Sequence, residues 1–292
     1  ENLGTAKEIV DATGKLVQKA VGAKDADQLL DFAQKVIGRN DKSGDYEVAY
    51  NEGKRDPEFL LDYVRALNAA GKPSLRITND YINAQSDLTT DINLRFLHEG
   101  AVEADSRVFD LLLKHQSKVA ALVGSEKVNT RIESACKKTL KKAIEFKSEA
   151  LLDEAKSKMK AGVPARAEAF AYDADMSYYS ATKDVKNYLK AAQAYQKGDV
   201  KNNSARLHDL VISLLRAFPD ESKVLDQAQK WSKTAAENGG MPEYYLTLAE
   251  IYKRQGNKEK ALDAAENARK AMGEKDNGLG GKIDYFIRSL GE

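Results

Sequence analysis

Residues 242–272, PEYYLTLAEIYKRQGNKEKALDAAENARKAM, decide the fold of this chain. One face of the first half carries Tyr245, Leu248, Ala249 and Tyr252. After a turn at Gly256-Asn257, one face of the second half carries the small residues Ala261, Ala265 and Ala268. Two antiparallel helices approach closely only where their side chains are short, and aromatic rings then fill the space beside them. The stretch therefore predicts a tightly packed helical hairpin.

The same spacing of small residues occurs once more upstream. Ala228, Ser232 and Ala235 each stand thirty-three positions before Ala261, Ala265 and Ala268. Residues 204–218 and 221–237 therefore predict a preceding hairpin, and residues 176–198 predict the turn of a third copy that begins near Ala165. A final helix with Ile283, Phe286, Ile287 and Leu290 on one face is expected to cover the open end of the array.

The last copy resembles a tetratricopeptide repeat. The matching positions are an aromatic residue, a Leu followed by a small residue, a Tyr, a Gly and three spaced Ala residues, and Gly273 stands where that family often has Pro. The resemblance implies an all-α, right-handed superhelix of helical hairpins that binds a protein or peptide partner. By the same resemblance, the inner surface would carry Glu243, Leu246, Glu250, Lys253 and Arg254. A carboxylate clamp needs Lys and Asn where Leu246 and Glu250 stand, so chaperone C-terminal peptides are not expected to bind.

The N-terminal stretch follows a different pattern. It contains a turn at Thr13-Gly14, an alternating run, Gly22 and a helix capped by Asp25. This order predicts half of a β-hairpin followed by a helix. A helical period over Thr5–Val21 also fits, although Gly14 would then lie inside a helix at a cost of about 1 kcal/mol relative to Ala. A hairpin without further strands is marginal in water, so both alternatives stay open, and we favour the hairpin.

Residues 9–37 are similar to the end of a thioredoxin domain, in which a D-x-x-G-K turn joins the last two strands. The matching residues are Asp11, Gly14 and Lys15, then Gly22 and Asp25. Followed by a long helical region, this ending looks like a class of bacterial cell-envelope proteins, which implies the periplasm or cell envelope. The redox motif of that class would lie upstream of Glu1, so the resemblance assigns no catalytic residue to this chain. Its implied role is the auxiliary tail of a thiol-disulfide oxidoreductase.

Three regions are expected: a thioredoxin-like remnant over 1–40, an irregular helical region over 41–163, and tetratricopeptide-like repeats over 164–292. In the second region, Asp56 and Pro57 predict a helix start, and Gly71 predicts its end. Residues 106–124 are expected to form one helix. A longer helical stretch follows to Gly162, with a break near Lys147 or Ser148.

Composition argues against several function classes. The 292 residues carry a formal net charge of +1, so no overall field favours nucleic acid or an anionic membrane. No apolar run is long enough to span a bilayer. The only cysteine, Cys136, excludes an internal disulfide, and His98, His115 and His208 lack metal-ligand spacing. We expect no catalytic residue, no cofactor and no metal.

Two residue clusters allow a functional or a structural interpretation. The basic cluster, Lys137, Lys138, Lys141 and Lys142, is interpreted as a solvated helix face rather than as a phosphate site. The tyrosine cluster either packs between helices or forms an aromatic patch that grips a peptide, and consists of Tyr172, Tyr178, Tyr179, Tyr188 and Tyr195. The main function expected is a non-catalytic scaffold for protein interaction. A weaker alternative is a small-molecule pocket between the two halves.

Overall fold

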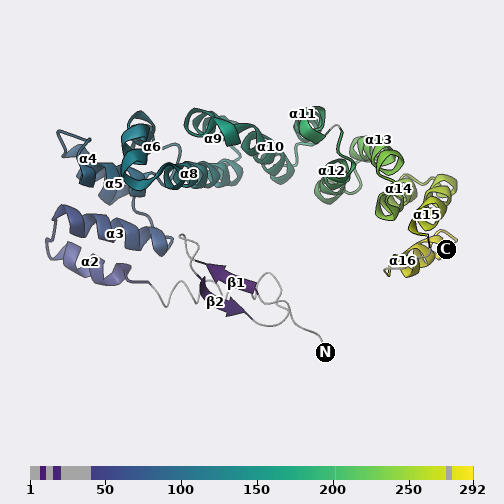
Figure 1. The fold of residues 1–292 in the computed structure, drawn as a ribbon, viewed down its shortest axis with the longest axis horizontal. Coiled ribbons are helices and arrows are strands. Elements are labelled where there is room, and N and C mark those ends of the chain that lie inside the picture. The colour runs from purple at the N-terminus through teal and green to yellow at the C-terminus, as the bar shows by residue number, and fades with distance from the viewer. Residues whose placement is uncertain (1–6, 11–15, 21–40, 201, 274–277, 292) are drawn as a thin grey trace. The chain divides into compact units, whose positions relative to one another are not determined.

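The computed structural model describes residues 7–10, 16–20, 41–200, 202–273 and 278–291 (Figure 1). The chain forms two compact units. The first consists of Glu1–Lys142 with Glu149–Ala167, and the second consists of Ala143–Ser148 with Glu168–Glu292. The three-part division at residues 40 and 163 stays a prediction.

The predicted all-α class is confirmed for the described residues from 41 onward. The helices that begin in the first unit are α2 (Ser43–Asn51), α3 (Pro57–Ala69), α4 (Leu75–Asn83), α5 (Asp91–Gly100), α6 (Arg107–Lys114), α7 (Gln116–Val123), α8 (Ser125–Phe146), α9 (Glu149–Gly162) and α10 (Pro164–Ala181). The second unit continues with α11 (Val185–Tyr195), the π-helical turn η1 (Gln196–Val200), α12 (Ser204–Ala217), α13 (Ser222–Gly239), α14 (Pro242–Arg254), α15 (Lys258–Met272) and α16 (Leu279–Arg288). The right-handed superhelix stays a prediction.

Two short strands precede the helices. Strand β1 (Lys7–Val10) pairs antiparallel with β2 (Leu16–Ala20), and the register shifts between Ile9 and Val10. These residues therefore follow the hairpin alternative and not the helical one. The turn residues Asp11, Gly14 and Lys15, with Gly22 and the helix expected after Asp25, lie outside the described residues.

Local capping signals place several helix ends where the sequence predicts them. Asp56 Oδ1 accepts a hydrogen bond from the Phe59 backbone N–H at 3.0 Å, and Pro57 opens α3. The turn between α14 and α15 uses Gly256 at φ +76°, a conformation that side chains with a Cβ rarely adopt. The next residue, Asn257, caps α15 by accepting from the Lys260 N–H at 3.1 Å.

Two details of the first unit differ from the sequence expectation. The polar stretch GRNDKSGD at residues 38–45 predicts a break in the helical pattern, but residues 43–51 form helix α2. Residues 106–124 do not form one helix, because the chain leaves helical geometry at His115 (φ −108°, ψ 16°). Just beyond this break, Gln116 Nε2 donates to the Gly162 carbonyl at 2.9 Å, a tertiary contact that fixes the start of α7. The predicted break near Lys147 is confirmed, since this residue has φ +50° between α8 and α9.

The second unit stacks its helices in chain order. Helix α12 packs on α13, α13 on α14, α14 on α15, and α15 on α16 (Figure 1). Two predicted hairpins form, as α12–α13 and α14–α15. The third predicted copy corresponds to α10 and α11, where the Tyr172 and Tyr195 rings lie 5.0 Å apart between centroids. The predicted contact face of α15 is fully buried at Ala261, Ala265 and Ala268. The GLGG stretch at residues 278–281 favours a flexible connection by its sequence, but Gly278 is the N-cap of α16 and residues 279–281 form its first turn.

The buried alanine face of α15 gives a stability prediction. Ala265→Leu inserts side-chain volume where α15 contacts α14, so the free energy of unfolding should fall by about 1–3 kcal/mol. Urea denaturation followed by circular dichroism measures the change. The matched control is Ala271→Leu, the same substitution at an exposed position of the same helix. Equal losses in the two variants would contradict close packing at Ala265.

Candidate functional site

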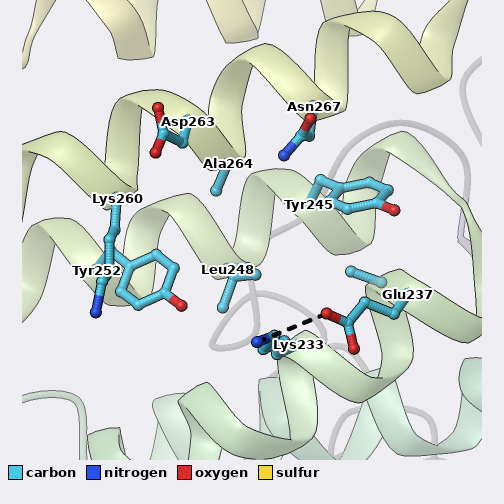
Figure 2. A pocket seen from close by; sticks show the side chains of 10 residues that line it. Lys233, Glu237, Tyr245, Leu248, Tyr252, Lys260, Asp263, Ala264 and Asn267 are labelled. Carbon is cyan, nitrogen blue, oxygen red and sulfur yellow. Dashed lines mark ion pairs between the residues drawn. The ribbon is translucent and has the colours of Figure 1, made fainter.

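Helix α14 separates two hollows in the second unit. The smaller, of about 260 Å³, lies among α13, α14 and α15 and is lined partly by Tyr245, Leu248 and Tyr252 (Figure 2). These three residues belong to the face that the sequence assigns to helix packing. An ion pair of 3.7 Å between Lys233 and Glu237 borders this hollow. Its volume is below the roughly 300–1,000 Å³ of typical ligand pockets.

The larger hollow, of about 910 Å³, falls inside that size range and is the candidate site. We call it the α14–α16 groove. Its α14 wall consists of Leu246, Glu250, Lys253 and Arg254, and its other wall consists of Gly278, Gly281, Lys282, Tyr285, Phe286 and Ser289. Four of the five residues predicted to line a binding surface therefore come together here. Their partner-binding role stays a prediction.

Packing and polar contacts hold α16 beside α14. Phe286 and Leu290 share one buried cluster with Leu248 and Ala249 of α14. Lys253 Nζ donates to Ser289 Oγ at 2.8 Å and to the Ser289 carbonyl at 3.3 Å. The same ammonium group lies 5.6 Å from the centroid of the Phe286 ring, within cation–π range. Lys253 thus helps to build the groove.

The remaining charged residues of the groove differ in whether they contact other parts of the chain. Arg254 Nη1 donates to the Pro219 carbonyl at 3.1 Å, which ties the end of α14 to the loop before α13. Glu250 and Lys282 are exposed on opposite walls, and neither forms an ion pair within the described chain. These two charges remain available for a ligand that carries charges of both signs.

Tyr285, like Lys282, lines the groove without being predicted from the sequence. Its side chain is 71% exposed, which is high for a large aromatic residue. It lies next to Phe286, whose buried face packs against α14. The sequence feature that indicates it is an aromatic residue beside the predicted apolar stripe of the last helix. An exposed aromatic ring at the edge of a groove is a frequent energetic anchor in protein interfaces.

Glu243, the fifth predicted residue, does not line the groove. Its atom Oε2 is buried and has no hydrogen-bond partner. The negative charge of Glu243 acts instead on His208 of α12, whose ring lies 4.4 Å from that of Tyr244. Burial lowers the pKa of His208 below its ordinary value of 6.5, although the charges of Asp209 and Glu243 act in the opposite direction.

The tyrosine cluster packs between helices, as the structural interpretation predicts. Tyr178 and Tyr188 are buried, and the other three are half-buried. The Tyr188 hydroxyl donates to the Ser213 carbonyl at 3.1 Å, and the Tyr172 hydroxyl donates to Glu168 at 2.9 Å. The hydroxyl groups of Tyr188 and Tyr172 therefore serve intramolecular contacts.

The basic cluster of α8 is a helix face with acidic partners. Lys137 pairs with Glu133 at 2.6 Å, and Lys138 and Lys142 each pair with Glu103 at 3.0 Å.

Within the described ranges, no group of three or more His, Cys, Asp or Glu side chains is arranged to hold a metal ion. None of the helices in that part of the chain combines the length and apolar character that crossing a bilayer requires.

Comparison with protein-family models and with curated proteins gives no match to the chain. The tetratricopeptide-like and thioredoxin-like resemblances therefore rest on the residues named above.

Cys136 gives a prediction about thiol reactivity. Its side chain is fully buried, and burial raises the pKa of the thiol to about 12. Because the thiolate is the reactive form, the folded protein should not react with a thiol reagent at pH 8, and it should take up one equivalent in urea. Fast labelling of the folded protein would contradict this burial.

His208 gives a prediction about pH dependence. Its pKa in the folded state lies below the unfolded value, so the unfolded state binds more protons just below pH 6.5. The contribution of His208 to the free energy of unfolding is therefore fully favourable above about pH 6.5. It declines as the pH falls towards the pKa of His208 in the folded state. Urea denaturation at pH 7.5 and 5.5 should show a smaller pH-dependent loss in His208→Gln than in the wild type. His115→Gln should keep the wild-type loss, and an unchanged loss in His208→Gln would refute the assignment.

Proposed function

We propose that this chain is a non-catalytic helical-repeat scaffold that binds a segment of another protein in the α14–α16 groove. The observation that carries the proposal is the convergence of Leu246, Glu250 and the exposed Tyr285 on one hollow of about 910 Å³. A groove of this size can accept a few side chains of an extended or helical peptide.

The charge pattern of the groove favours a protein ligand over a nucleic acid. Glu250 on one wall opposes Lys282 on the other, whereas phosphate backbones favour a continuous basic surface. A peptide with one basic and one acidic side chain, flanking an apolar residue for the Tyr285 ring, matches this arrangement. Such a peptide would replace water at an apolar centre and leave the charged pairs at the rim.

The experiment uses variants that leave the α14–α16 contact intact. Lys253 and Arg254 already bind Ser289 and Pro219, so their replacement would also disturb the fold. Glu250→Lys and Tyr285→Ala change side chains that are exposed. A random peptide library is selected on the full chain, and the affinities of the selected peptides are measured by titration calorimetry.

Both groove variants should weaken the selected peptides at least tenfold, because Tyr285→Ala removes the aromatic contact and Glu250→Lys places a positive charge against the basic side chain of the peptide. The matched control is Glu266→Lys, the same charge change at an exposed position of α15 outside the groove. Selected peptides that bind both groove variants and the control equally would remove this groove as the binding surface. Circular dichroism of each variant verifies that folding is unchanged.

A second function is supported by the antiparallel pairing of β1 and β2. We propose that the chain serves as the auxiliary tail of a thiol-disulfide oxidoreductase in the periplasm or cell envelope, with the hairpin as the end of its thioredoxin-like domain. The D-x-x-G-K pattern at Asp11, Gly14 and Lys15 lies between the two strands. The test is the coding sequence before Glu1, where a W-C-x-x-C segment is expected. If that sequence lacks a thioredoxin domain with such a segment, this candidate fails.

A further inference from the structure

A polar pocket in the first compact unit has no part in the proposed function. It has a volume of about 190 Å³ and is bordered by α3, α5, α7 and the start of α8. Its polar lining consists of Arg65, Arg95, His98, Glu99 and Lys127. Two apolar residues of α7 complete the wall. Three permanent cations and one carboxylate thus converge on a small volume.

The single carboxylate of this pocket is already neutralised. Glu99 Oε2 accepts from Arg131 Nη2 at 2.7 Å, and Glu99 Oε1 lies 3.4 Å from Arg65 Nε. Burial alone would raise the pKa of Glu99, but the hydrogen bond with His98 and the charges of Arg131 and Arg65 lower it to about 2. Glu99 therefore stays ionised and pairs with Arg131, which is not among the residues that line the pocket.

The other cations of the pocket retain positive charge. Arg65 is shared between Glu99 and Asp62, whose Oδ1 lies 3.1 Å from Arg65 Nη1. Arg95 and Lys127 form no ion pair with an acidic side chain of the described chain. Lys127 also lies in the first turn of the 22-residue helix α8, where the helix dipole is positive. Two uncompensated positive charges therefore face one pocket.

We infer that this pocket binds a small doubly charged oxyanion, either inorganic phosphate or the phosphate group of a small phosphomonoester, with Arg95 and Lys127 as its main ligands and Arg65 as a third. The volume is below the roughly 300–1,000 Å³ of pockets for drug-sized molecules, so it suits a single anionic group. Planar guanidinium groups donate two parallel hydrogen bonds to phosphate oxygens, and a lysine adds a point charge. A dianion matches the two free charges, whereas a carboxylate would leave one of them unpaired.

The test is calorimetric titration of the full chain with inorganic phosphate at constant ionic strength, with acetate and glycerol phosphate as parallel ligands. Phosphate should bind, and acetate should bind at least tenfold more weakly. Arg95→Gln and Lys127→Gln should each weaken phosphate at least tenfold while circular dichroism stays unchanged. Tighter binding of glycerol phosphate would identify a phosphomonoester as the ligand, and tighter binding of phosphate would identify the free ion.

The matched control is Lys118→Gln, which removes one exposed positive charge from α7 outside the pocket lining. It should leave the affinity for phosphate unchanged. An equal loss in Lys118→Gln and Arg95→Gln would show a general charge effect and overturn the inference. Equal affinities for acetate and phosphate, or no binding of phosphate at millimolar concentration, would overturn it as well. None of these outcomes bears on the α14–α16 groove, which belongs to the other unit.

Discussion

The close contact between α14 and α15 is the constraint on which the candidate site depends. It requires side chains no larger than a methyl group at Ala261 and Ala265, both of which are fully buried. Phe286 and Leu290, at the C-terminal end of the chain, belong to the same buried cluster as these alanines. Larger residues would separate α15 from α14 and move the surface on which α16 packs. One wall of the groove is thus positioned by residues that do not line it.

The two candidate binding places use charge in opposite ways. In the α14–α16 groove, Glu250 and Lys282 carry opposite charges on facing walls, and the local charge is balanced. In the smaller pocket, Arg95 and Lys127 carry the same charge, while the one acidic group is held by Arg131. The formal net charge of +1 conceals this local separation. Charge balance over a whole chain therefore excludes a strong overall field, but it does not exclude a local site for an ion.

Local patterns in the sequence predicted the helical part of the fold well. The capping residue Asp56 and the breaks at Lys147 and Gly256 appear where expected, because each acts within a few positions of itself. The break at His115 could not be found this way, since the contact beside it joins Gln116 to Gly162, forty-six positions away. In the site, the repeat pattern predicts Leu246 and Glu250 on a binding surface. It does not predict Tyr285, because the sequence pattern indicates the last helix only as the cover of the open end of the array.

The sequence by itself determined where helices form and which of their faces are apolar, because hydrophobic period, capping and glycine turns are local properties. Only the tertiary structure decided which charges meet. Glu99 joins Arg65 and Arg131, which lie thirty-four and thirty-two positions away, and Lys253 reaches Ser289 across thirty-six positions. The tertiary structure also leaves Glu243 outside the groove lining, where its charge acts on His208. Such contacts depend on how helix faces pack against one another, and no local pattern records that packing.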